Sequence, residues 1–287
     1  MNQHHRFYAY ARLLRLDRPI GNFLLLWPTL WALWLAGNGH PSPQLVFLFI
    51  VGVILMRGLG CIINDIADRN FDGFVARTKD RPLVIAAITL KEAVGLLLFL
   101  CFLAFCLVLQ FNSLTVKLSF IGLALTFLYP YAKRFTYWPQ SIIGLTFSWG
   151  IPMAFAAQTN KIPGIAWLLF ITASLWTLAY DTVYAMVDRD DDRKIGIKST
   201  ALLLGRGDCL FVAVVQLSFM VLLACLGYVL QLRNFFYLGL GFAGGLLVYQ
   251  QYLIKDRKPD RCFKAFLNNA WVGAWIFAAF FLGIRPG

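Results

Sequence analysis

The fold of this chain is decided by an apolar stretch, LVFLFIVGVILMRGLGCIIND, at residues 45–65. A helix of about 20 apolar residues spans the roughly 30 Å hydrocarbon core of a bilayer. Eight further stretches resemble it, with approximate bounds 20–36, 92–110, 115–132, 139–157, 163–185, 208–230, 235–254 and 266–283. They are continuous rather than alternating, which excludes a β-barrel, and backbone amides in lipid need partners within a helix. The sequence therefore predicts an all-α polytopic membrane protein with nine transmembrane helices.

The composition agrees with this class of protein. Of the 287 residues, 60% are hydrophobic and only 14% are charged, whereas about 25% are charged in an average soluble domain. So few charged side chains cannot coat a water-soluble protein of this length. We expect no cleavable signal peptide, and we interpret the six cysteines as small apolar residues because they lack paired metal-site spacing.

The lysines and arginines predict how the chain is oriented. Twenty-one of the 26 fall on one side of the predicted spans, Arg57 lies within a span, and Lys117, Lys161, Arg233 and Arg285 fall on the other side. Positive charge is enriched in cytoplasmic loops. We therefore expect a cytoplasmic N-terminus and an external C-terminus, and we expect no nucleic-acid partner for this basic chain.

The 14 acidic side chains crowd the same, cytoplasmic side. Two sets of polar residues have helical spacing: Asn64, Asp68 and Asp72 in the first, and Asp181, Tyr184, Asp188 and Asp192 in the second. Each set is expected on one face of a helix. Carboxylates near the hydrocarbon are unfavourable without a compensating cation. Oxygen ligands without histidine or cysteine favour Mg²⁺ or Ca²⁺ over zinc.

The two sets are four predicted helices apart. We therefore expect a single domain, residues 1–287, built from two related four-helix units at roughly 20–132 and 139–254 and a ninth helix at 266–283. Such a repeat would bring the two acidic sets to face each other across one cavity, open to the cytoplasm and to lipid.

Basic residues interleaved with the acidic sets suggest a diphosphate as the partner. Four bases lie within or just after the first set and four lie within or just after the second: Arg69, Arg77, Lys79 and Arg81, and Arg189, Arg193, Lys194 and Lys198. Lys133 and Arg134 follow the fourth predicted helix. Arginine and lysine bind the phosphate oxygens that a metal leaves free. Anionic lipid and topology are the alternative reasons for any one of these bases.

Arg57 is a separate case because it lies inside an apolar run, two helical turns before Asn64. An intramembrane arginine indicates a functional site. The alternative is a structural role, as a partner of Asp181 or of a backbone carbonyl.

At this point the residues resemble the UbiA-type intramembrane prenyltransferases, and among them the group that acts on 4-hydroxybenzoate. The similarity extends over nearly the whole chain and includes LMRGLGCIINDIADRNFD, TKDRPL, YPYAKRFTYWPQ and AYDTVYAMVDRDDDRKIGIKST. The motif N-D-x-x-D-x-x-x-D matches Asn64, Asp65, Asp68 and Asp72, and D-x-x-x-D matches Asp188 and Asp192. After TKDRPL the group usually has P-S-G, whereas this chain has a Val-Ile-Ala segment at 84–86. The resemblance therefore does not fix the conformation of this segment, but it leaves the metal ligands unaffected.

The resemblance implies a Mg²⁺-dependent transfer of a polyprenyl group from polyprenyl diphosphate to 4-hydroxybenzoate, in ubiquinone synthesis at the bacterial inner membrane. Mg²⁺ would be held by Asp68, Asp72, Asp188 and Asp192, and Asn64 would hold a diphosphate oxygen or a bound water. We expect Asp188 to accept the phenolic proton, and Arg134, then Arg57, to bind the carboxylate of the aromatic acid. The other expected substrate-binding residues are Lys133, Arg69, Arg77, Lys198, Tyr184 and Asp181.

Three alternatives remain open from the sequence. The first is a prenyltransferase that acts on a different acceptor, such as a naphthoate, homogentisate or haem. The second is a secondary transporter, although the acidic residues of this chain crowd one side of the membrane rather than its midplane. The third is a CDP-alcohol phosphotransferase, whose pattern overlaps DGFVAR at 72–77. That pattern needs an aspartate where Arg69 stands, and glycine and aspartate where Ala86 and Leu90 stand.

Overall fold

The computed structural model describes residues 3–285, and every regular element in that range is a helix. The predicted all-α class is confirmed. The expected domain, residues 1–287, also contains residues 1–2 and 286–287, which lie outside the described part.

Long helices make up most of the chain. They are α2 (Ile20–Ala36), α3 (Pro43–Asp68), α4 (Leu90–Val108), α5 (Ser113–Phe135), α8 (Gly164–Val187), α11 (Asp208–Val229), α12 (Asn234–Ile254) and α13 (Pro259–Gly283). Within residues 3–285, six helical stretches are long and apolar enough to cross a membrane: α3, α4, α5, α8, residues 200–229 around α11, and α13. The apolar helix α2 is shorter. The chain is therefore an integral membrane protein.

The prediction of one helix over 139–157 is wrong. The segment forms two helices, α6 (Pro139–Ser148) and α7 (Gly150–Thr159), which meet at Trp149. Pro152 explains the break, because it has no N–H for the carbonyl of Ser148, and its ring disfavours a continuous helix there.

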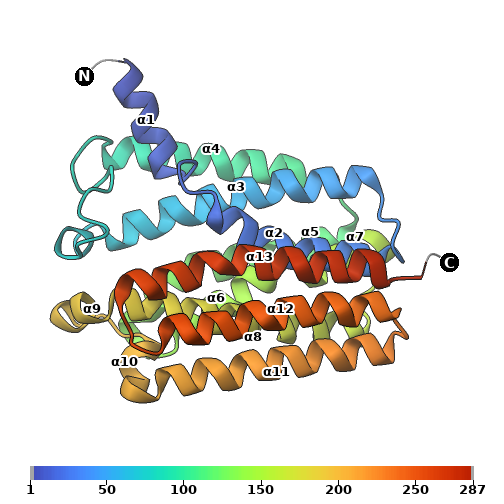
Figure 1. Ribbon diagram of the computed structural model, residues 1–287. Coiled ribbons are helices and arrows are strands. Elements are labelled where there is room, and N and C mark those ends of the chain that lie inside the picture. The colour runs from blue at the N-terminus through green and yellow to red at the C-terminus, as the bar shows by residue number, and fades with distance from the viewer. Residues whose placement is uncertain (1–2, 286–287) are drawn as a thin grey trace.

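The loops contain short helices that the sequence did not predict. They are α1 (Gln3–Leu13), α9 (Arg189–Ile195), α10 (Thr200–Leu204) and two 3₁₀ turns, η1 (Asp72–Phe74) and η2 (Gly205–Gly207). In Figure 1, α1, α9 and α10 lie at one end of the bundle, and the C-terminal end of α13 lies at the other. The acidic sets are at the end that carries α9, because α3 and α8 both terminate there.

A tryptophan pair forms the centre of the core between α2, α8 and α13. Trp31 and Trp176 are fully buried, and their ring centroids are 5.2 Å apart. The indole N–H of Trp31 donates to the carbonyl of Gly273 at 3.1 Å, and that of Trp176 donates to Oδ1 of Asn269 at 2.9 Å. Satisfied polar groups in an apolar interior fix relative positions. The core therefore holds α8 rigidly, and α8 carries part of the candidate site.

Candidate active site

A cavity of about 470 Å³ lies inside the bundle, lined by residues of α2 to α9, of the segments before α2 and after α3, α4 and α9, and of α13. Its wall is apolar near the N-terminal half of α3, where it is lined by Leu48, Phe49, Val108 and Phe111. The ring centroids of Phe49 and Phe111 are 5.1 Å apart. Its wall is acidic and basic near the C-terminal end of α3. All four aspartates predicted to bind metal line this one cavity: Asp68, Asp72, Asp188 and Asp192.

The first acidic set reaches the cavity by a different backbone path from the one predicted. Asn64 and Asp68 lie on α3, but α3 ends at Asp68, and Asp72 begins the 3₁₀ turn η1. The prediction of a continuous helical face from Asn64 to Asp72 is therefore wrong. The turn that follows α3 is closed by the amide of Phe71, which donates to the carbonyl of Asp68 at 2.8 Å.

The second acidic set is interrupted in the same way. Asp181 and Tyr184 lie on α8, which ends at Val187, whereas Asp192 lies on the separate short helix α9. Asp188 joins the two helices as a non-helical residue with φ −94° and ψ 3°. The predicted single face for these four residues is therefore wrong, although all four line the cavity.

Basic side chains pair with the carboxylates at the acidic end of the cavity, near the C-terminal end of α3; this end is called the mouth below. Asp68 accepts a bond from the ammonium of Lys133, and Nη1 of Arg81 donates to Oδ2 of Asp72 at 2.6 Å. Nη2 of Arg77 donates to Oδ2 of Asp188 at 2.5 Å. The residue Arg77 thus joins the segment after α3 to the second acidic set.

The electrostatics of the mouth favour an additional cation. Burial raises the pKa of Asp72 above its ordinary value, although the facing Arg81 opposes this shift. Burial, and then the charge of Asp188, raise the pKa of Asp192 to about 7. In both cases burial disfavours the ionised carboxylate, and a cation bound nearby would favour it.

The donor set fits Mg²⁺ in chemistry. Oδ1 of Asp68 is buried without a hydrogen-bond partner, and the surrounding ligands are carboxylate and amide oxygens, which Mg²⁺ prefers. Within residues 3–285, no three histidine, cysteine, aspartate or glutamate side chains are already grouped closely enough to hold a metal. Lys133, Arg81 and Arg77 are paired with Asp68, Asp72 and Asp188, so a cation that binds these carboxylates displaces those side chains.

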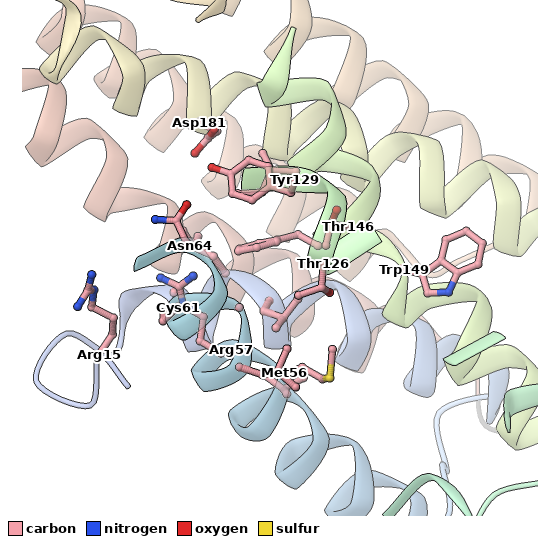
Figure 2. Close-up of a pocket in the computed structure, with 18 of the residues that line it drawn as sticks. Arg15, Met56, Arg57, Cys61, Asn64, Thr126, Tyr129, Thr146, Trp149 and Asp181 are labelled. Atoms are coloured by element: carbon pink, nitrogen blue, oxygen red, sulfur yellow. The ribbon is translucent and has the colours of Figure 1, made fainter. Parts of the chain in front are cut away.

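A second polar group lies deeper, next to the apolar wall. Figure 2 shows Arg57 and Asn64 of α3, Tyr129 of α5 and Asp181 of α8 directed into the same space. Nε of Arg57 is buried and has no hydrogen-bond partner among the described residues. Its guanidinium carbon lies 5.9 Å from the ring centroid of Phe147. The alternative structural role, a bond from Arg57 to Asp181 or to a carbonyl, does not occur within the described residues.

Two of the predicted substrate-binding residues do not line the main cavity. Arg69 and Arg134 are exposed. Nη2 of Arg134 donates to the carbonyl of Ala67 at 2.5 Å, and its guanidinium lies over the rings of Phe71 and Tyr131. Lys133, Lys198, Arg77, Tyr184 and Asp181 do line the cavity.

Sequence reasoning gave no separate role at this site to Asp65 or Arg15, and it named Arg81 only as one of several bases suited to a diphosphate. Asp65 is 1% exposed and pairs with Arg15 and Arg81, and all three line the cavity. A signal existed for Asp65, which belongs to the first acidic motif, and for Arg81, which belongs to TKDRPL. Arg15 had no such signal, because only the path of the chain between α1 and α2 brings it to Asp65.

Residues 25–283 match the model of the UbiA prenyltransferase family. The chain belongs to this family. A protein of Psychromonas ingrahamii named 4-hydroxybenzoate octaprenyltransferase is 53% identical over 275 residues, which cover 96% of this chain and 96% of that protein. A protein of Vibrio campbellii with the same name is 56% identical over 265 residues, which cover 92% and 93%. Family membership decides against the transporter and the CDP-alcohol phosphotransferase.

Solved structures of the family share this fold. An apo structure of a UbiA homolog from Aeropyrum pernix has a TM-score of 0.79 at 24% identity, covering 91% of this chain and 97% of that one. A UbiA homolog from Archaeoglobus fulgidus, bound to DMAPP and Mg²⁺, has a TM-score of 0.72 at 17% identity, covering 94% and 98%. At these identities the likeness concerns the fold.

Proposed function

We propose that this chain transfers a polyprenyl group from polyprenyl diphosphate to the ring carbon of 4-hydroxybenzoate that lies ortho to the hydroxyl, in a Mg²⁺-dependent step of ubiquinone synthesis. The observation that carries the proposal is the convergence of both acidic motifs, from helices far apart in sequence, on one cavity with an apolar end. Relatives named 4-hydroxybenzoate octaprenyltransferase, at 51–56% identity, support the choice of acceptor.

Asp68, Asp72, Asp188 and Asp192 would hold Mg²⁺, with Asn64 on a ligand oxygen or water. The bound cation supplies positive charge that makes the diphosphate a better leaving group. Support for the metal comes from the unpartnered Oδ1 of Asp68 and from the gathering of four aspartates around one cavity.

The bases at the mouth would bind the remaining diphosphate oxygens. Arg77, Lys133 and Lys198 line the cavity next to the acidic residues. Their charge-assisted hydrogen bonds suit phosphate oxygens. Because Arg77 and Lys133 pair with aspartates here, we propose that they pass from carboxylate to diphosphate when the substrate enters. The exposed Arg69 would attract the anion from solution.

We assign the carboxylate of the aromatic acid to Arg57 rather than to Arg134. Arg57 lies inside the cavity with an unpartnered Nε, whereas Arg134 is exposed and bonded to the carbonyl of Ala67. Tyr184 and Tyr129 line the space in which the ring would sit. We also assign the phenolic proton to Asp181 rather than to Asp188, because Asp188 would hold Mg²⁺, whereas Asp181 lines the cavity and has no ionic partner among the described residues.

The reaction balances without a further reactant. The bond between the first prenyl carbon and the diphosphate oxygen breaks, and a bond forms between that carbon and the ortho ring carbon. The ring hydrogen leaves as a proton, and the phenolic oxygen recovers the proton that Asp181 accepted, so that the net products are the prenylated acid, pyrophosphate and one proton. The apolar wall of the cavity keeps water from the allylic cation.

We also propose nine membrane spans in one domain, with α6 and α7 together forming one broken span and the two four-helix units related as a repeat. The N-terminus and the acidic motifs would lie in the cytoplasm and the C-terminus outside, in the bacterial inner membrane. The charge asymmetry of the sequence supports this orientation. A single cysteine introduced at Lys161 should react with an impermeant thiol reagent added outside intact cells, and one at Lys194 should not.

The function is tested by product analysis. Purified protein is mixed with a polyprenyl diphosphate, Mg²⁺ and a panel of aromatic acids, and products are identified by mass spectrometry. We expect prenylated 4-hydroxybenzoate, equimolar pyrophosphate, and no product when EDTA replaces Mg²⁺. Preference for a naphthoate or homogentisate would reject the proposed acceptor.

Variants of the four aspartates test the site. Asp68→Ala, Asp72→Ala, Asp188→Ala and Asp192→Ala should each abolish turnover while the protein still inserts into the membrane. Asp256→Asn is the control, because Asp256 pairs with Arg261 and does not line the cavity. Near-normal turnover in any two of the four variants would reject the metal assignment.

A further inference from the structure

Asp65 is a buried carboxylate beside the proposed metal ligands, and it forms ion pairs with two arginines. It is 1% exposed, and its Oδ1 lies 2.8 Å from Nη2 of Arg15 and 3.1 Å from Nη1 of Arg81. Arg15 has a left-handed backbone, with φ +57°. A non-glycine residue adopts this conformation only where the surrounding structure enforces it. The surrounding structure therefore holds Arg15 in place against Asp65.

Arg81 is shared between two carboxylates through one nitrogen. Its Nη1 lies 2.6 Å from Oδ2 of Asp72 and 3.1 Å from Oδ1 of Asp65. The side chain of Arg81 is 13% exposed and that of Asp72 is 8% exposed. Charges in such surroundings interact more strongly than in water. A cation that binds Asp72 must therefore compete with Arg81, and Asp65 weakens that competition because it attracts the same guanidinium.

We propose that Asp65 is a positioning residue that draws Arg81 away from Asp72 and so frees Asp72 for the cation. The inference rests on the proposed function, because it assumes that Asp72 binds Mg²⁺. When the cation takes Asp72, Arg81 stays near Asp65 at the mouth of the cavity, where a diphosphate oxygen is within reach of its other nitrogens. Arg15 also pairs with Asp65, and it therefore weakens the attraction of Asp65 for Arg81.

The test measures Mg²⁺ binding without turnover. The protein in detergent is heated with inorganic pyrophosphate at increasing Mg²⁺ concentrations, and the midpoint is the Mg²⁺ concentration that gives half of the maximal rise in Tm. Asp65→Asn keeps the shape of the side chain but removes its charge, so Arg81 pairs with Asp72 alone. We expect the midpoint to rise about tenfold, which corresponds to about 1.4 kcal/mol. An unchanged midpoint would overturn the proposal.

A double-mutant cycle separates positioning from a long-range effect of charge. If Asp65 acts through Arg81, Asp65→Asn should change the midpoint less than twofold in an Arg81→Gln background. A tenfold rise in both backgrounds would show that Asp65 acts only as a distant negative charge, and would overturn the proposal.

Asp208 provides a matched control for the loss of a buried charge. It is fully buried and pairs with Arg189 and Arg257, but it does not line the cavity. Asp208→Asn should lower Tm and leave the Mg²⁺ midpoint within twofold of the parent. A midpoint that rises as much as in Asp65→Asn would assign the effect to general loosening and overturn the proposal.

A second variant covers the case in which Asp65→Asn does not fold. Arg15→Gln leaves the charge of Asp65 to Arg81 alone, so the midpoint should fall about threefold, and no fall would overturn the proposal. Failure of the proposed function looks different, because the parent protein itself would then show no rise in Tm with Mg²⁺ and pyrophosphate.

Discussion

Gly21 offers a way to move Arg57 without changing any charge. A Cβ atom built on Gly21 would lie 2.5 Å from Cζ of Arg57, and closer still to its Nε and Nη2. Ordinary van der Waals contact begins at 3.4 Å. Gly21→Ala must therefore push the guanidinium aside by about 1 Å. Arg57 has a long flexible side chain, so this displacement costs little folding stability.

The catalytic cost follows from hydrogen-bond geometry. A guanidinium displaced by about 1 Å no longer reaches a carboxylate at hydrogen-bond distance. Bonds to charged groups contribute about 1.5–3 kcal/mol, which corresponds to roughly 10- to 150-fold in affinity. We expect KM for 4-hydroxybenzoate to rise by that factor in Gly21→Ala, while KM for the polyprenyl diphosphate changes less than threefold.

The assay is steady-state kinetics with each substrate varied in turn, followed by extraction of the prenylated acid. The matched control is Gly95→Ala on α4, where an added Cβ meets no atom within 4 Å. An unchanged KM for the aromatic acid in Gly21→Ala, or an equal rise for both substrates, would refute the role of Arg57.

Three further predictions concern backbone strain, helix packing and the other arginine. Ala86 is exposed and has φ +53°, a backbone conformation that costs a non-glycine residue about 1 kcal/mol. Ala86→Gly should therefore raise Tm and leave turnover unchanged, and a lower Tm would contradict the inferred backbone strain. A Cβ on Gly239 would lie 2.6 Å from Cβ of Ala279, so Gly239→Ala should force α12 and α13 apart and cost about 1–3 kcal/mol in unfolding measurements. Gly241→Ala on the same helix meets nothing and should not destabilise, and equal losses in both variants would argue against close packing. Arg134→Gln should change KM for the aromatic acid less than threefold, whereas a rise as large as that in Arg57→Gln would return the carboxylate site to Arg134.

The helical class and most helix positions were predictable because lipid imposes a simple rule. The predicted span 20–36 agrees with α2, and 208–230 agrees with α11 within one residue. The start of α4 was placed two residues late, at Glu92 instead of Leu90. The capping box of Thr89 and Glu92 sets that start, and it depends on local hydrogen bonds rather than on apolarity.

The backbone conformation at the ends of the two acidic motifs was not predictable from the spacing of the aspartates. Spacings of four suggested continuous helices through Asp72 and Asp192, but α3 stops at Asp68 and α8 stops at Val187. Both segments leave the apolar bundle at these points, so backbone turns and ion pairs replace helical hydrogen bonds. The break at Trp149 had a signal in Pro152, and the exposed position of Arg134 had none.

The sequence by itself determined that this chain is a membrane-embedded helical protein and which aspartates lie near its basic end, because burial in lipid and motif composition depend on local residue order. Only the tertiary structure decided which arginine faces which carboxylate. The pairs Arg77–Asp188, Arg81–Asp72 and Arg15–Asp65 join residues from separate elements. Their distances depend on how helices pack and where loops turn, and contacts of this kind leave no periodic trace along the chain.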